Sequence, residues 1–346
     1  MSEERRISNR QMQVLSLVDS LGILLVTLPL GTAIISGASG WTFVLFGGIL
    51  TAVIMAMAVS CDSLYEWLVD KKLGNIVGFL LCGKMIYCGG IWLRYFSETI
   101  NQLLLPKTST WLISLLFLIV AVYAACKGIE ARGRFAEIVI VIIFFVLVFI
   151  FALSAQNIKF ENFQPYDIMQ GGNAILYTVS AFFGIEYLFL ASPYINGKKK
   201  GKNAFIVGCI TALILSGATA FAVGVFGVEG VTERRWAVLQ IMDTIDFPLM
   251  LLERQDVLMM GFWITSMFAF INGAAFYSGN VLSRIIAKRD RFVPMFIVVA
   301  MLIFFVSLAQ DNIVSVTEVI NNAMILNLIT EGFVILVFIF GRRRRI

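Results

Sequence analysis

The sequence contains no histidine, which removes a Cys/His metal site and a histidine proton shuttle from consideration. Its five cysteines form no CxxC pair, and Cys82, Cys88 and Cys209 lie in apolar runs, where cysteine acts as a small packing residue. The chain also lacks a GxSxG motif, a phosphate-binding loop and a recognisable pair of catalytic carboxylates. We therefore expect no enzymatic activity, no cofactor and no bound metal.

Charged residues are also scarce. They make up only 14% of the chain, whereas 59% of it is hydrophobic and the mean hydropathy is +0.89. Soluble domains are typically about 25% charged and 45–50% apolar. The sequence therefore predicts a polytopic membrane protein. The first apolar run lacks a small-residue cleavage site, so we do not expect a cleaved signal peptide. The net charge of +5 is no signature of nucleic-acid binding, and we expect no nucleic-acid partner.

What the sequence has in abundance is long apolar segments. We count ten that can span about 30 Å of hydrocarbon, at about 20 residues each. They cover residues 12–36, 41–61, 74–105, 110–126, 135–155, 172–194, 204–227, 256–284, 292–309 and 313–340. The predicted fold is an all-α protein that forms a single transmembrane domain over residues 1–346. The longest connection, 228–255, is polar enough to lie outside the membrane.

The placement of lysine and arginine predicts the orientation. If the N-terminus is cytoplasmic, 20 of these residues fall in cytoplasmic segments and 5 in outer ones, and Lys84 and Arg94 remain inside the third span. Basic residues favour cytoplasmic loops, so this ratio favours ten spans with both termini in the cytoplasm. The basic runs then need no other function, and the run Arg342–Arg345 is expected at an anionic leaflet.

Ten spans divide into two sets of five, at about 12–155 and 172–340, in which the first and sixth spans are oppositely directed counterparts. The first carries Pro29, which cannot donate a backbone hydrogen bond, and the flexible Gly31. The sixth carries Gly184 in mid-segment. Paired interruptions of this kind are typical of inverted-repeat transporters, in which broken helices surround the ligand. For the first span taken alone, a harmless proline kink is an equal alternative.

Ionisable groups inside membrane segments are costly and are functional candidates by default. Glu186, beside Gly184, is the strongest candidate, although an ion pair with a neighbouring helix is the structural alternative. Lys84 lies deep in the third span, where extension of its side chain to the inner surface is the alternative. Asp19 can reach water at the cytoplasmic end of the first span. Glu318 and Glu331 on the last span favour packing over ligand contact, and their roles remain open, as does that of Asp19.

These groups suit a small zwitterionic ligand. Backbone N–H groups freed at a broken helix can hold a carboxylate, and freed carbonyls together with Glu186 can hold an ammonium group. Four aromatic residues are candidates for shaping the side-chain pocket: Tyr87, Tyr177, Phe182 and Phe183.

Several stretches resemble one family, the B subunits of bacterial spore germinant receptors, a branch of the amino acid–polyamine–organocation transporter superfamily. The resemblance spans nearly the whole chain, and the order of its short motifs is more specific than any one of them. The matching stretches are Thr27–Pro29, Lys127–Ile138, Gly184–Glu186, Trp236–Pro248, Leu252–Val257 and Trp263.

The resemblance implies a fold like that of sodium-coupled amino acid transporters, with the first and sixth helices unwound around the ligand. It implies a receptor that senses a small germinant in the inner membrane of the spore, with an A subunit and a lipoprotein C subunit as partners. A coupled or facilitative amino acid transporter is the alternative, and a scaffold or channel subunit is a third reading. The implied pocket consists of Gly22, Thr27, Leu28, Pro29, Gly31, Lys84, Tyr87, Ser180, Phe183, Gly184 and Glu186, beside Tyr177.

Overall fold

The computed structural model describes residues 6–244, 256–289, 292–310 and 312–343, and these residues are almost entirely helical. The elements in chain order are β1 (Ile7–Ser8), α1 (Asn9–Ser36), α2 (Gly40–Val59), α3 (Asp62–Asp70), α4 (Lys72–Leu103), α5 (Thr110–Cys126), α6 (Ile129–Ser154), η1 (Ala155–Asn157), η2 (Phe160–Phe163), α7 (Gly171–Ala181), α8 (Ile185–Ala191), η3 (Ser192–Tyr194), β2 (Ile195–Asn196), α9 (Lys200–Glu233), η4 (Leu239–Thr244), α10 (Asp256–Leu282), the π-helical turn η6 (Ser283–Ala287), α11 (Val293–Leu308) and α12 (Ile313–Arg343).

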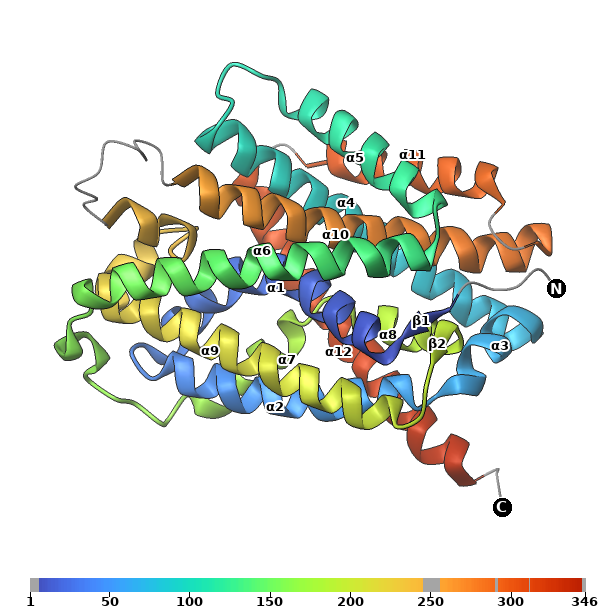
Figure 1. The fold of residues 1–346 in the computed structure, drawn as a ribbon, viewed down its shortest axis with the longest axis horizontal. Coiled ribbons are helices and arrows are strands. Elements are labelled where there is room, and N and C mark those ends of the chain that lie inside the picture. Colours follow the sequence, from blue (N-terminus) through green and yellow to red (C-terminus); the bar gives the residue numbers. More distant parts are fainter. Residues whose placement is uncertain (1–5, 245–255, 290–291, 311, 344–346) are drawn as a thin grey trace.

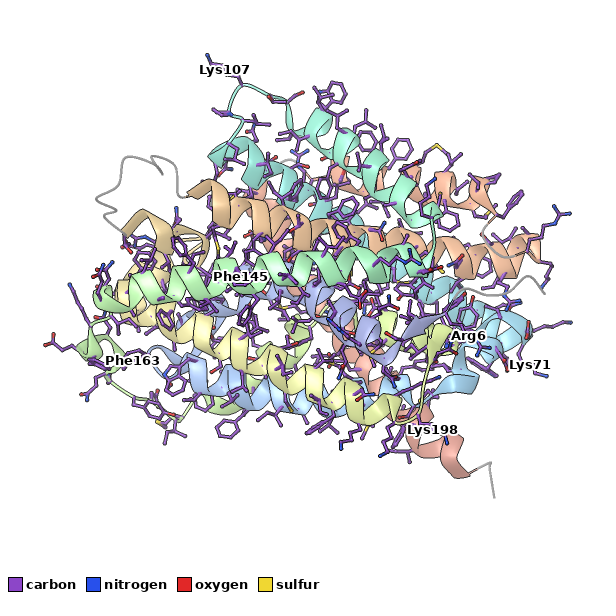
Figure 2. All side chains as sticks on the ribbon, viewed as in Figure 1. Arg6, Lys71, Lys107, Phe145, Phe163 and Lys198 are labelled. Carbon is purple, nitrogen blue, oxygen red and sulfur yellow. The ribbon has the colours of Figure 1, made fainter. Side chains whose placement is uncertain are left out.

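The helices form a bundle in which α1 and α10 are mostly buried and α6 is mostly exposed. In Figure 1, α5 and α11 lie along one side of the bundle, and α2 and α9 along the other. Exposed positions on the outer helices are apolar; Phe145 of α6, labelled in Figure 2, is 66% exposed. An apolar outer surface around a helical backbone suits a hydrocarbon environment, because a helix satisfies its own backbone hydrogen bonds.

The number of spans differs in part from the ten that the sequence predicts. Among the described residues, seven helices are long and apolar enough to cross a membrane, and α7 with α8 and η3 makes an eighth if this bent pair is one span. The helices α5 and α11 are apolar but shorter, with 17 and 16 residues. A large helical membrane fold is therefore supported, whereas the exact count of ten and the inverted repeat remain predictions.

The two helices that were expected to break behave differently. The helix α1 continues without interruption from Asn9 to Ser36, through Pro29, so the predicted break at Thr27–Gly31 is wrong. The sixth span is interrupted: α7 ends at Ala181, α8 begins at Ile185, and the two parts are bent by 45°. The prediction of an interruption at Gly184 is therefore confirmed.

Three of the basic residues that the charge count assigned to one side lie together at one end of the bundle. Figure 2 places Arg6, Lys71 and Lys198 at that end and Lys107 at the opposite end. The short parallel pair β1–β2 ties the start of α1 to the segment after α8, because Ile7 pairs with Ile195. One boundary is corrected: α9 continues through a kink at Gly227 to Glu233, so the connection predicted at 228–255 begins later, and its residues 245–255 lie outside the described part.

Candidate functional site

The break between α7 and α8 is made by three residues, Phe182, Phe183 and Gly184. Gly184 has φ 96° and ψ 8°, a left-handed conformation that glycine adopts without the steric penalty of a Cβ. Short turns close the end of α7: Phe182 N–H donates to the Val179 carbonyl and Phe183 N–H to the Ala181 carbonyl. The local sequence therefore ends one helix and starts the next in a new direction.

The first turn of α8 carries one partner of a buried ion pair. Lys84 Nζ of α4 lies 2.9 Å from Glu186 Oε2, and both side chains are under 10% exposed. Lys84 therefore does not extend to the inner surface, and Glu186 is paired with a neighbouring helix, the structural alternative for this residue. Pairing matters because an isolated charge at this depth would be strongly unfavourable.

A second buried ion pair joins α1 to the start of α6. Arg132 Nη2 donates to Asp19 Oδ1 at 3.1 Å and Oδ2 at 2.9 Å, and also to the Ala269 carbonyl of α10 at 3.3 Å. The guanidinium carbon lies 5.1 Å from the ring centroid of Tyr277. The charge count placed Arg132 in a cytoplasmic loop, which is wrong, because α6 begins at Ile129 and its first turn points Arg132 into the bundle.

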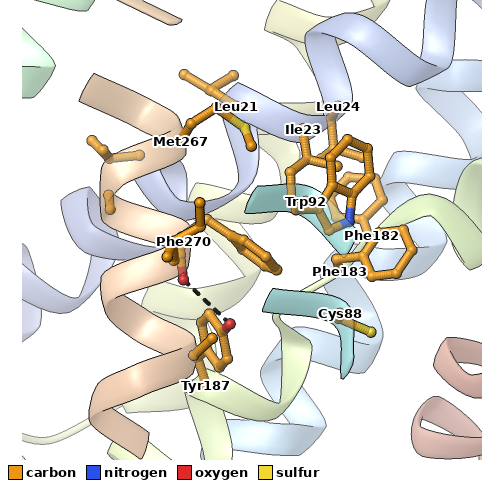
Figure 3. Close-up of a cluster of buried hydrophobic side chains, with 14 of the residues drawn as sticks. Leu21, Ile23, Leu24, Cys88, Trp92, Phe182, Phe183, Tyr187, Met267 and Phe270 are labelled. Carbon is orange, nitrogen blue, oxygen red and sulfur yellow. Dashed lines mark hydrogen bonds between the residues drawn. The ribbon is translucent and has the colours of Figure 1, made fainter. Parts of the chain in front are cut away.

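Aromatic side chains fill the space between α1 and the break. Trp92 of α4 packs edge-on against Phe183, with ring centroids 5.5 Å apart. Figure 3 shows Phe182, Phe183 and Trp92 gathered beside Ile23 and Leu24 of α1. These rings fill the region that the predicted pocket would need.

Below this aromatic layer, Tyr187 connects α8 with α10. Its hydroxyl donates to the Phe270 carbonyl at 3.3 Å, as the dashed line in Figure 3 shows, and its ring stacks on Tyr277 at 5.1 Å. A cavity of about 20 Å³ lies here, lined by Asp19, Gly184 and Tyr187 among others. That volume holds about one water molecule and no amino acid.

The predicted residues of α1 meet α7 rather than the ion pairs. The Tyr177 hydroxyl donates to the Thr27 carbonyl at 3.3 Å. A Cβ on Gly31 would lie 2.1 Å from the Tyr177 ring, so only glycine allows this close approach. Pro29 and Leu28 are buried in the same turn. The structure thus brings Thr27, Gly31 and Tyr177 together without unwinding α1.

Two predicted residues lie at the margin of this group. The Gly22 carbonyl accepts a hydrogen bond from Trp263 Nε1 at 2.8 Å, and a Cβ on Gly22 would lie 2.8 Å from Ser266 Cβ, so its position is set by packing against α10. Tyr87 is half-buried and lines, with Lys84 and Thr330, a cavity of about 470 Å³ between α4 and α12. That cavity opens beside exposed apolar side chains such as Leu80 and Ile329.

Three residues that were not predicted as part of the pocket lie close to the predicted ones, and one of them, Glu331, had been assigned to packing. Arg132 lies in the stretch Lys127–Ile138, which was noted for its resemblance and then counted only as surface charge. Asn327 Nδ2 of α12 donates to the Ser180 carbonyl, the last turn of α7, at 2.8 Å. Glu331, one turn further along α12, is buried within electrostatic reach of Lys84 and Glu186. The i, i+4 spacing of Asn327 and Glu331 was the sequence pattern that could have indicated a shared helix face.

The comparisons with known proteins give both a family and a fold. A family model described as "Spore germination protein" matches residues 6–313. The chain is 26% identical over 267 residues to spore germination protein YndE of Bacillus subtilis (strain 168), covering 72% of each chain. It is 23% identical over 307 residues to spore germination protein A2 of the same organism, covering 84% of this chain and 83% of the relative.

A solved structure has a similar fold across nearly all of the chain. It is Mhp1, a nucleobase-cation-symport-1 family transporter, in a closed conformation with bromovinylhydantoin bound. The TM-score is 0.73, and the match covers 99% of this chain and 80% of that one. Because the sequences are only 13% identical, this similarity shows a transporter fold and carries no information on the ligand.

Proposed function

The chain belongs to the spore germination protein family, and from this premise we propose that it is an integral membrane receptor subunit that senses a small germinant. In this proposal an amino-acid-like nutrient binds in mid-membrane, at the break between α7 and α8, and triggers germination. The observation that carries the proposal is the break itself. Irregular backbone at membrane depth is tolerated where it is buried in protein or lines a cavity, and in transporter folds it marks the binding site.

The closed form of the site supports sensing by a change of conformation. The cavity beneath Gly184 is too small for an amino acid, so a ligand must displace the rings of Phe182 and Phe183. A ligand shifts such an equilibrium by its higher affinity for the open form. Because α8 carries Glu186 and Tyr187, movement at the break would be transmitted to α4 and α10.

The proposed pocket contains the residues that the sequence predicts, but the structure supports a different position for each group of them. Tyr177, Ser180, Phe183 and Gly184 surround the break, and Lys84 with Glu186 supplies its charges. The α1 side is formed by Thr27–Gly31 as continuous helix. Gly22 and Tyr87 belong to the rim of this pocket.

We assign to the same proposal a location in the inner membrane of the spore, with both termini cytoplasmic. A germinant receptor A subunit and a lipoprotein C subunit are the proposed partners. Purification of a tagged chain from spore membranes is expected to recover both subunits in fixed proportion. Recovery of the chain alone, under conditions that preserve other membrane complexes, would contradict this part of the proposal.

The site is tested by substituting Glu186 in spores. Glu186→Gln is expected to shift the germinant concentration for half-maximal germination, while the membrane level of the protein stays unchanged. The matched control is Glu318→Gln, which removes an exposed carboxylate from α12. An unaltered dose dependence for Glu186→Gln, with normal protein level, would count against the proposed pocket.

The similarity to a transporter fold supports a second candidate function, the transport of an amino acid or similar solute. The two functions are separated by uptake of labelled amino acids into proteoliposomes that contain the purified chain alone. A pure receptor is expected to bind without turnover. Robust saturable uptake would favour the transporter.

A further inference from the structure

Two polar residues of α12 lie one helical turn apart on its buried face. Asn327 is 1% exposed and Glu331 is 3% exposed, and their i, i+4 spacing places them side by side. The other asparagine and glutamate residues of the same helix, Asn321, Asn322 and Glu318, are exposed. Burial of this one pair in a membrane helix is costly and calls for a specific partner.

Each of the two residues presents an oxygen that has no hydrogen-bond donor in the described part of the chain. These atoms are Asn327 Oδ1 and Glu331 Oε1. The orientation of the Asn327 amide is fixed, because its Nδ2 donates to the Ser180 carbonyl at 2.8 Å. One face of α12 therefore carries two buried acceptors without a donor, and Asn327 holds this face against the end of α7.

The surrounding charges favour a cation. Lys84 pairs with Glu186 and also interacts electrostatically with Glu331. Because the Lys84–Glu186 pair is neutral as a whole, Glu331 adds one uncompensated negative charge when it ionises beside an incoming cation. The C-terminal end of α7, which Asn327 contacts, adds the partial negative charge of a helix terminus.

We propose that Asn327 and Glu331 bind the primary ammonium group of the ligand, as a subsite of the pocket at the α7–α8 break. This inference rests on the proposed ligand-binding function and specifies the chemistry that the ligand must carry. An ammonium group has three N–H donors and one positive charge. It matches the two unpartnered oxygens and neutralises the excess charge beside Lys84. Glu331, rather than Glu186, is then the carboxylate that contacts the ligand amine, because Glu186 is already paired.

The test measures thermal unfolding of the purified chain in detergent with ethylammonium chloride as the probe. Sodium chloride and tetramethylammonium chloride at equal concentration are the controls, since neither cation can donate an N–H hydrogen bond. Ethylammonium is expected to raise the unfolding midpoint of the natural chain beyond both controls. Glu331→Gln is expected to raise the half-saturating ethylammonium concentration on the order of tenfold or more. Glu331→Asp is expected to fall in between, and Glu318→Gln to match the natural chain.

Equal stabilisation by sodium or tetramethylammonium would overturn the proposal, because the site would then recognise charge without N–H donors. An unchanged half-saturating concentration in Glu331→Gln would overturn it as well. If a panel of amino acids stabilises the natural chain and Glu331→Gln equally, the proposed receptor function is retained and the proposed ammonium subsite is contradicted. If neither the amino acids nor ethylammonium bind the natural chain, both proposals fall.

Discussion

The two buried ion pairs differ in the ionisable groups that surround them. The pair between Arg132 and Asp19 is balanced in charge, and its guanidinium also contacts the Ala269 carbonyl and two aromatic rings. The pair between Lys84 and Glu186 has a third ionisable group within electrostatic reach, Glu331, whose ionisation would leave the cluster unbalanced by one negative charge. The two pairs are linked through α8: Glu186 belongs to one of them, and the next residue, Tyr187, stacks on Tyr277, whose ring lies beside Arg132 of the other. We infer that the balanced pair fixes the bundle and the unbalanced one serves recognition.

The largest expected effect comes from breaking the balanced pair. Arg132→Met leaves Asp19 as a buried, uncompensated charge, and it is expected to lower the free energy of unfolding in detergent by about 3–5 kcal/mol. The double variant Asp19→Leu with Arg132→Met is expected to recover most of this loss, since no charge is left buried. The exposed pair Arg134–Glu130 is the matched control, and Glu130→Gln is expected to cost less than about 0.5 kcal/mol. A double variant as unstable as the single one would show that Arg132 acts through packing instead.

The unbalanced cluster is expected to respond asymmetrically. Lys84→Met leaves two carboxylates without a cation and is expected to cost about 3–5 kcal/mol. Glu186→Gln leaves Glu331 to compensate Lys84, so its cost is expected to be smaller, about 1–3 kcal/mol. The same unfolding measurement compares the two variants. Equal losses would mean that Glu331 does not share the charge of Lys84, and the contrast between the two pairs would disappear.

Substitution of Gly273 in α10 is expected to disturb the packing around the Arg132–Asp19 pair alone, with a smaller effect on stability. An added Cβ would lie 2.7 Å from the Tyr187 ring and 2.9 Å from Arg132 Nη2. Gly273→Ala is expected to lower the free energy of unfolding by about 1–3 kcal/mol, through overpacking. The half-saturating concentration of ethylammonium should stay unchanged, because Glu331 and Asn327 lie on another helix. A large change in that affinity would show that the two pairs are coupled through α8.

The sequence supports the membrane fold and the interruption at Gly184 because both depend on local signals. Apolar length predicts spans directly, and a glycine beside a buried carboxylate predicts a break. Pro29 misleads for a physical reason. A proline removes one backbone donor, but α1 stays helical around it, and neighbouring groups such as the Tyr177 hydroxyl contact its turn from outside.

The partners of the charged residues could not be predicted, because they come from distant parts of the chain. Asp19 and Arg132 are 113 residues apart, and Lys84 and Glu186 are 102 apart. Hydropathy and charge counting treat each residue by its own segment, so Arg132 was counted as a surface charge. The pair Asn327 and Glu331 was visible as an i, i+4 pattern, but only packing shows which face of α12 is buried.

Gly184→Ala tests the connection between the two pairs, and of these variants it is expected to lower the free energy of unfolding the least. The left-handed conformation at φ 96° disfavours any Cβ, at a cost of about 1–2 kcal/mol, and the added atom would lie only 3.3 Å from the Tyr187 ring. Because α8 starts at the next residue, a change here re-aims Glu186 and Tyr187 together. We expect Gly184→Ala to shift the germinant dose response in spores further than Gly273→Ala, despite its smaller effect on unfolding. A dose response that follows stability alone would show that the break at Gly184 is only a structural bend.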